Sequence, residues 1–285
     1  MHVLIVGCGY VGLELGRHLT PDHRVTGVRR GDRGLQAIAD AGLEAVRADA
    51  SNPSDLVALP DVDAVVYAAS ARGEASARET YVESLRTLID HFDERRDPPS
   101  QFLYTSSTGV YSDHEGQWVD ETTELRPTSE RERILREAER IALERGSSIA
   151  DRTVVRFGGI YGPGRSPVQR YLTGPVSPGY GNFGHRADAA GAVAHLLTET
   201  EDCAPIVNVV DDQPIDRPEL ARWIAERHDE TPPAVVPLDD RDLADARAER
   251  LAANKRVDDD RLHACGYDLR YPSVTAGIQD GLESD

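Results

Sequence analysis

The stretch Val3-Leu4-Ile5-Val6-Gly7-Cys8-Gly9-Tyr10-Val11-Gly12 joins a short apolar segment to a helical pattern through three glycines. Glycine at 7 permits a tight turn, glycine at 9 lets the main chain approach a diphosphate, and glycine at 12 lets the helix pack closely on the strand. The helix N-terminus then favours negative charge. The alternative is that these glycines serve only packing. In this strand–turn–helix context we predict a dinucleotide site formed by Gly7, Gly9, Tyr10, Val11 and Gly12.

Similar apolar segments recur along the first half of the chain and alternate with helical patterns, which is typical of a doubly wound parallel sheet. The predicted strands are Val3–Val6, Arg24–Val28, Glu44–Val46, Ala64–Ala68, Phe102–Thr105 and Thr153–Phe157. After Phe157 glycine, proline and serine become frequent, and a further strand is predicted at Ile206–Val210. We therefore expect an α/β protein of Rossmann type, with a dinucleotide-binding domain at residues 1–157 and a smaller, interleaved C-terminal substrate lobe at residues 158–285.

The charge of the chain is strongly acidic. The 285 residues include 50 acidic and 32 basic side chains, which gives a net charge of −18. Such a surface repels a polyanion, so nucleic acid is not an expected partner. Lys255 is the only lysine, and an acidic, lysine-poor surface resembles proteins of salt-loving microbes. A GC-rich genome is the alternative explanation.

Other features concern location and metals. No apolar run approaches the roughly 18 residues of a membrane span, and Met1 leads within two residues into the first strand, which leaves no room for a leader. A cytoplasmic protein without membrane contact is expected. The nine histidines are scattered without the spacing of metal ligands, so we expect no metal site.

Three further segments bear on the cofactor. Arg29 and Arg30 end the second strand, where an NAD site usually has an acidic residue, and arginine suits the 2′-phosphate of NADP. NADP is therefore the preferred cofactor, while neighbouring Asp32 keeps NAD as the alternative. Asp49 follows the third strand and is expected either to contact adenine or to begin a turn. Small residues end the fourth strand, where a cofactor could pass closely: Ala68, Ala69 and Ser70.

Together these segments resemble the extended short-chain dehydrogenase/reductases, also called NAD-dependent epimerase/dehydratases. Besides the glycine loop, the resemblance rests on Tyr104–Tyr111, which is similar to the family's SSxxVYG segment, and on Arg156–Gly164, which is similar to its RxxxxYGPG segment. His185–Ala190 and Asn208–Asp212 are similar to later family segments. The resemblance implies a small-molecule substrate and a homodimer built from helical stripes in residues 75–95 and 130–145.

The chain departs from this family at its catalytic pair. A Tyr-x-x-x-Lys pair follows a proline in the family, and its lysine lowers the pKa of the tyrosine that moves a proton. Counted from Pro127, the two positions are occupied by Arg131 and Leu135, and Pro127–Glu139 contains no tyrosine or lysine. The chain therefore resembles the atypical members that lack the pair.

The remaining candidates are expectations from this resemblance. Ser107 stands at the catalytic serine position and would donate a hydrogen bond to a substrate oxygen, unless it only caps a strand end. Tyr111 is the nearest phenol and the candidate proton donor. The candidate substrate-binding residues are Arg131, which would clamp a phosphate or carboxylate or else pair with nearby glutamates, and Tyr161 and His185 in the glycine-rich segment.

Two functions stay open. The chain is either an oxidoreductase of epimerase/dehydratase type acting on a nucleotide sugar or another small hydroxyl or carbonyl compound, or a non-catalytic NAD(P)-binding sensor or regulatory module. The glycine loop fits both. The missing pair favours the second, whereas Ser107 and the Tyr161-Gly162-Pro163-Gly164 segment favour the first.

Overall fold

The computed structural model describes residues 1–71, 76–199 and 203–283, which form two compact units. Unit 1 consists of Met1–Ser107, Glu130–Arg156 and Ala190–Val207. Unit 2 consists of Thr108–Ser129, Phe157–Ala189 and Asn208–Asp285. The chain thus passes between the units several times, and one passage lies at Arg156, next to the boundary expected from the sequence.

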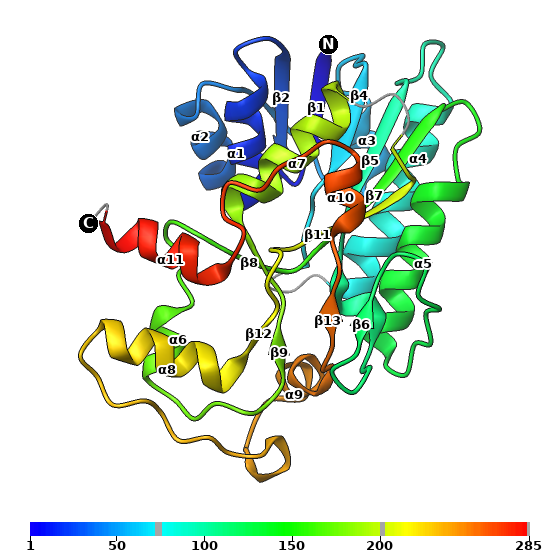
Figure 1. Cartoon of the computed structure of the whole chain (residues 1–285). Coiled ribbons are helices and arrows are strands. Elements are labelled where there is room, and N and C mark those ends of the chain that lie inside the picture. The colour runs from blue at the N-terminus through cyan, green and yellow to red at the C-terminus, as the bar shows by residue number, and fades with distance from the viewer. Residues whose placement is uncertain (72–75, 200–202, 284–285) are drawn as a thin grey trace. The chain divides into compact units, whose positions relative to one another are not determined.

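A seven-stranded sheet runs in the order β11-β7-β5-β4-β1-β2-β3 (Figure 1). Its strands are β1 (His2–Val6), β2 (Arg24–Arg29), β3 (Glu44–Arg47), β4 (Ala64–Tyr67), β5 (Gln101–Ser107), β7 (Asp151–Phe157) and β11 (Ile206–Val209). β1 pairs in parallel with both β2 and β4, so the glycine stretch follows the central strand. This topology confirms the predicted doubly wound fold.

Helices cover both faces of this sheet because successive side chains of a strand point to opposite faces. On β1, Leu4 and Val6 belong to the core formed with α3, α4 and α5, whereas Ile5 packs under Gly12 of α1. The helices are α1 (Tyr10–Leu19), α2 (Asp32–Asp40), α3 (Pro53–Leu56), α4 (Ser84–Asp93), α5 (Glu130–Glu144) and α7 (Arg186–Thr198). A wider, π-helical turn, Glu79–Glu83, precedes α4.

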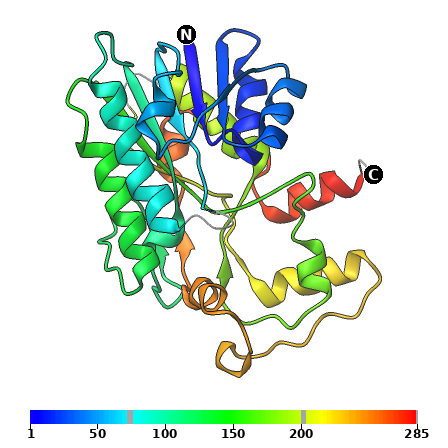
Figure 2. The same cartoon turned by 180° about the vertical axis from the view of Figure 1, so that it is seen from behind.

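The helices α4 and α5 lie side by side on one face of the sheet (Figure 2). The apolar stripe expected in residues 75–95 is present on α4 as Leu85, Leu88 and Phe92, and residue 75 lies outside the described residues. That stripe and the stripe of α5 are both buried in the core of unit 1. The side chains on which the homodimer expectation rested are therefore already covered within the chain.

Unit 2 is built from short elements around three two-stranded pairings, β8 with β10, β9 with β12 and β6 with β13. The strands are β6 (Trp118–Val119), β8 (Gly159–Tyr161), β9 (Tyr180–Gly181), β10 (Phe183–His185), β12 (Ile215–Asp216) and β13 (Arg256–Val257). The helices, besides the first residues of α7, are α6 (Val168–Leu172), α8 (Arg217–Arg227), α9 (Asp245–Ala252), α10 (Asp260–Ala264) and α11 (Val274–Glu283), with 3₁₀ turns at Thr108–Tyr111 and Leu238–Asp240.

Asn208 ties distant segments of unit 2 together. Its side-chain oxygen accepts a hydrogen bond from the Tyr111 hydroxyl at 2.8 Å, and its side-chain nitrogen donates to the Asp258 carbonyl at 2.9 Å. Its backbone N–H donates to the Glu121 carboxylate at 2.7 Å. Because Asn208 is fully buried, these bonds satisfy groups that water cannot reach.

None of the helices in the described part of the chain combines the length and the apolar character needed to cross a membrane.

Candidate functional site

Gly7 fixes the turn after β1. Its φ of +82° lies in the left-handed region, and a Cβ on this residue would fall 2.4 Å from the Ala69 backbone. The N–H groups of Gly7 and Cys8 both donate to the Val28 carbonyl, at 3.2 and 3.3 Å. No other residue type fits both the conformation and the space, so the first glycine is required by the main chain around it.

The next two glycines differ in what they approach. Gly9 is the N-cap of α1, and a Cβ there would meet the guanidinium Nη1 of Arg29 at 3.1 Å. At Gly12 a Cβ would meet Cγ2 of Ile5 at 3.0 Å, which is the close contact between helix and strand expected from the sequence. Tyr10 and Val11 lie in the first turn of α1, and the N-terminus of a helix favours an anion.

Cys8 lies between the first two glycines, and its side chain is buried in the core. It packs against Gly27, where a Cβ would lie 2.9 Å from the Cys8 sulfur. Burial raises the pKa of the Cys8 thiol to about 12, so this free cysteine is an unreactive part of the core at neutral pH.

Arg29 and Arg30 are both exposed at the end of β2. The guanidinium of Arg29 lies beside Gly9 and Gly34, and that of Arg30 donates to Asp49 at 3.2 Å. Asp32, the acidic residue that kept NAD as an alternative, forms an ion pair with Arg47. The Arg29 guanidinium therefore lies beside the glycine loop.

Asp49 forms a local turn as well as an ion pair. Its Oδ1 accepts from the Ser51 N–H at 3.0 Å and from the Ser51 hydroxyl at 2.7 Å. Burial alone would raise the pKa of Asp49, but these bonds and the Arg30 charge outweigh it and lower the pKa. These contacts favour the turn alternative, and a contact with adenine stays a prediction.

The small residues after β4 adjoin the glycine loop. The Ala68 N–H donates to the Val6 carbonyl at 2.8 Å, and the main chain of Ala68 and Ala69 is what a side chain at position 7 would strike. Ser70 follows as an exposed residue. Unit 1 thus brings the glycine loop, the two arginines and this small-residue segment together.

The two catalytic candidates differ in accessibility. Ser107 is the last residue of β5 in unit 1 and is half-buried. Tyr111, in unit 2, is fully buried, and its hydroxyl donates to Asn208. A proton-donor role for Tyr111 would require that bond to break, so this role stays a prediction, whereas the bond itself gives Tyr111 a structural role.

The family's catalytic pair has no equivalent on α5. Leu135, at the lysine position, is 2% exposed, and Arg131, one turn earlier, is half-buried and makes no ion pair among the described residues. Burial raises the pKa of the Tyr104 hydroxyl well above its ordinary value, the Glu139 charge adds to this, and Arg131 opposes it. The Arg131 guanidinium therefore lies near a buried phenol, and the raised pKa of that phenol keeps it protonated at neutral pH.

A buried ion pair occupies the next turn of α5. Arg156 donates to both oxygens of Glu139, at 2.9 and 2.7 Å, and the Ser106 hydroxyl donates to the same carboxylate at 2.6 Å. No sequence pattern indicated this network, although Arg156 is the first residue of one of the segments that carried the family resemblance. The network joins α5 to β5 and β7 inside unit 1.

Tyr161 and His185 lie together in unit 2, with ring centroids 5.1 Å apart. The Tyr161 hydroxyl donates to the Ser273 carbonyl at 3.3 Å, and burial raises its pKa. His185 also packs on Tyr271, with ring centroids 4.1 Å apart, and its Nδ1 accepts from the Ala187 N–H at 3.2 Å. Both side chains are buried, so substrate contact stays a prediction for each.

Comparison with known proteins decides the family. A family model described as NAD(P)H-binding matches residues 7–200.

The chain belongs to the NAD(P)H-binding family.

Protein YeeZ of Escherichia coli K12 is 33% identical to this chain over 204 residues, which cover 68% of this chain and 72% of YeeZ. A candidate NAD-dependent epimerase/dehydratase from Methylobacillus flagellatus is 30% identical, with a TM-score of 0.80 over 99% of this chain and 98% of that one. The human epimerase family protein SDR39U1 with NADPH is 21% identical, with a TM-score of 0.82 over the whole of both chains. The resemblance to epimerase/dehydratases is thereby confirmed, and so is an NAD(P)-binding fold.

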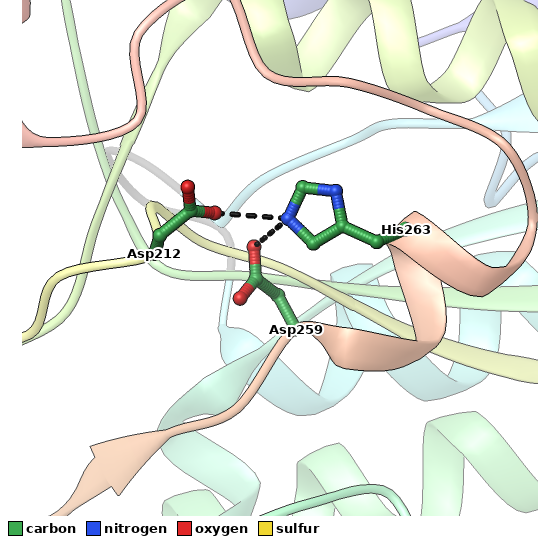
Figure 3. A group of neighbouring side chains, drawn as sticks. All are labelled: Asp212, Asp259 and His263. Atoms are coloured by element: carbon green, nitrogen blue, oxygen red, sulfur yellow. Dashed lines mark hydrogen bonds and ion pairs between the residues drawn. The ribbon is translucent and has the colours of Figure 1, made fainter.

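A second polar group of this NAD(P)H-binding chain, in unit 2, was not expected from the sequence. Figure 3 shows Asp212, Asp259 and His263, with His263 Nε2 lying 2.9 Å from Asp212 and 3.5 Å from Asp259. Burial and the Asp212 carboxylate raise the pKa of Asp259 to about 7. Burial opposes a charged His263, but the two carboxylates outweigh it and raise its pKa. Only the Asp-x-x-x-His spacing of 259 and 263 could have indicated part of this group.

Proposed function

We propose that this chain binds NADP(H) in preference to NAD(H) and takes part in a redox reaction of epimerase/dehydratase type. Its substrate would be a small hydroxyl or carbonyl compound, such as a nucleotide sugar. The observation that carries the proposal is the glycine loop, where Gly7 adopts a left-handed φ against Ala69 and the Arg29 guanidinium lies beside Gly9.

The residues present fit such a cofactor. Gly9 and the first turn of α1 would receive the diphosphate through main-chain N–H groups, Gly7 would fix the turn beneath it, and Arg29 and Arg30 would receive the 2′-phosphate. Ala68, Ala69 and Ser70 leave room for close passage. When bound, the nicotinamide supplies or accepts a hydride.

The substrate roles follow from the side chains that remain. Ser107 would donate a hydrogen bond to a substrate oxygen, and Arg131 would hold a phosphate or carboxylate, since its guanidinium has no ion-pair partner in the described part of the chain. A guanidinium donates hydrogen bonds and accepts none, so Arg131 would orient the substrate.

A second function is favoured by one observation. Leu135 fills the lysine position with a buried apolar side chain, so the usual means of activating a phenol is absent there. A non-catalytic NADP(H)-binding module is the function that this replacement favours.

Cofactor preference is tested by titrating NADPH and NADH into the wild type, Arg29→Ser and Arg24→Ser. Arg24 is the matched control because it is an exposed arginine at the other end of β2, paired with Glu44. We expect Arg29→Ser to weaken NADPH binding at least tenfold, leave NADH binding unchanged, and differ from the control. Equal affinity of the wild type for the two nucleotides would contradict the proposed preference.

The two functions are separated by a hydride-transfer screen with nucleotide sugars and small carbonyl compounds. Turnover that Ser107→Ala abolishes, with NADPH binding intact, supports the enzyme. Tight NADPH binding without turnover of any compound supports the non-catalytic module.

Three broader properties also belong to the proposal. A cytoplasmic location would give access to the NADPH pool, and adaptation to high salt would suit the charge of −18. A homodimer would have to use the charged outer faces of α4 and α5, such as Arg86 and Arg140, because their apolar stripes are buried in unit 1. Light scattering in high salt measures the oligomeric state, and the mass of a monomer would contradict the proposed homodimer.

A further inference from the structure

The group formed by Asp212, Asp259 and His263 joins two distant segments of unit 2. Asp212 follows β11 at the end of the Asn208–Asp212 segment, while Asp259 and His263 lie one helical turn apart at α10. One ligand atom from each residue lies within 4.8 Å of the others. Figure 3 shows both carboxylates directed at the same nitrogen of the imidazole.

The imidazole is oriented from its other side. Nδ1 of His263 lies 3.0 Å from the Tyr267 carbonyl oxygen. A carbonyl can only accept, so Nδ1 carries a proton, and in the neutral ring Nε2 presents its lone pair toward the two carboxylates. Metal-binding histidines are typically held in this way by a backbone carbonyl or a carboxylate.

The burial of Asp259 is a second, independent observation that points to a cation at this group. Its side chain is 9% exposed, and its Oδ2, the atom facing His263, is shielded from solvent and accepts no well-formed hydrogen bond from the described residues. The neighbouring Asp211 is 1% exposed, and its carboxylate oxygens are likewise without a well-formed hydrogen bond there. A buried carboxylate oxygen without a well-formed hydrogen bond is costly, and a cation would offset that cost.

We propose that Asp212, Asp259 and His263 form a binding site for a divalent transition-metal ion, with Zn²⁺ or Mn²⁺ as the expected type. Two carboxylate oxygens and one imidazole nitrogen are a donor set that these ions accept, whereas Ca²⁺ and Mg²⁺ prefer oxygen donors alone.

The spacing suits a small ion. Ligand atoms around a tetrahedral Zn²⁺ lie about 3.3 Å apart, given bonds of about 2.0 Å. Nε2 lies 2.9 and 3.5 Å from the two carboxylate oxygens, and no pair of the three atoms exceeds 4.8 Å. Closing the set around an ion therefore requires movements of about 1 Å, and the fourth position would remain for water or another ligand.

The alternative is that a protonated His263 is itself the cation of this group. An imidazolium would bridge Asp212 and Asp259 through one N–H, and the group would then serve only to connect α10 with the segment after β11. This alternative predicts no saturable metal binding at the three residues, so a direct titration separates the two.

The test is calorimetric titration of the chelator-treated full chain with ZnCl₂ and with MnCl₂, in KCl high enough to screen the exposed carboxylates. We expect one saturable site for at least one of the two ions. Asp212→Asn and His263→Asn should each weaken binding at least tenfold. Asp260→Asn is the matched control, because Asp260 is an exposed carboxylate next to Asp259 on the same segment.

Two results would overturn the proposal. One is the absence of saturable binding of both ions to the wild type, and the other is equal weakening by Asp212→Asn and Asp260→Asn, which would indicate diffuse charge. Circular dichroism of each variant checks folding, and Asp212→Asn decides the case if His263→Asn does not fold, since the Asp212 side chain is 39% exposed. Co²⁺ gives a second readout, because its visible absorption reports an ordered site and should be lost in Asp212→Asn but kept in Asp260→Asn.

Discussion

The loop after β1 and the helix α5 both belong to unit 1, and both correspond to segments that define the epimerase/dehydratase family, yet they have diverged differently. The loop works through main-chain geometry, with Gly7 fixed by its φ and by Ala69. The helix would work through titratable side chains, and these have become Arg131 and a buried Leu135. The main-chain geometry of the loop and the titratable side chains of the helix are therefore separable features of one fold, and this chain keeps the first where its second differs from the family pattern.

The largest expected effect is on the loop. Gly7→Ala places a Cβ 2.4 Å from the Ala69 backbone at a φ of +82°. We expect the free energy of unfolding to fall by about 3 kcal/mol and NADPH binding to weaken at least 100-fold, because strain and overlap act together. Urea unfolding and nucleotide titration measure the two effects.

Gly42→Ala is the control for that substitution. Gly42 has a similar φ of +76°, but no atom lies within 4 Å of a Cβ built there. It should cost only about 1 kcal/mol and leave NADPH binding unchanged. If both variants lost the same stability and binding, the close approach of Gly7 to Ala69 would not be what fixes the loop.

The next effect concerns α5. Glu139→Gln removes the charge that faces Arg156, which is 2% exposed, and should destabilise the fold by about 3 kcal/mol because a buried guanidinium is left uncompensated. Glu137→Gln, on the same helix but in a more exposed pair with Arg78, should cost less than about 1 kcal/mol. Equal losses in urea unfolding would show that α5 is not anchored by its buried pair.

The smallest effect separates surface charge from both regions. Raising KCl from about 0.1 to about 1 M shortens the screening length from about 10 to about 3 Å and weakens repulsion among exposed carboxylates. The wild type should melt a few degrees higher, and the destabilisation caused by Glu139→Gln should stay nearly constant because that pair is buried. A lower melting temperature in KCl would contradict adaptation to salt.

Most of the fold was predictable from the sequence because its signals are local. The strand at Val3–Val6, the three glycines and the helix after them follow from short-range patterns, and β1 to β5 lie within a few residues of their expected bounds. Gly12 packs on Ile5 as its position predicts. The dimer expectation was weaker, because a helical stripe does not reveal whether the chain's own sheet or a partner covers it.

The polar groups were harder to predict because their members are distant in sequence. Arg156 forms an ion pair with Glu139 in unit 1, and His263 contacts Asp212 in unit 2. No spacing rule connects such residues, since their proximity depends on how the elements pack. Tyr111 illustrates the same limit, because its partner Asn208 lies 97 residues away.

The hydrogen bonds of Asn208 bear on how related proteins can be recognised. With every polar atom of its side chain and its N–H engaged by Tyr111, Asp258 and Glu121, exchange of this amide would disturb three stretches of chain simultaneously. Such a position should be retained in related chains with this fold. The Asn208–Asp212 segment is consequently a marker of the shared fold. It is a poor guide to the reaction that a protein catalyses when new genomes are searched.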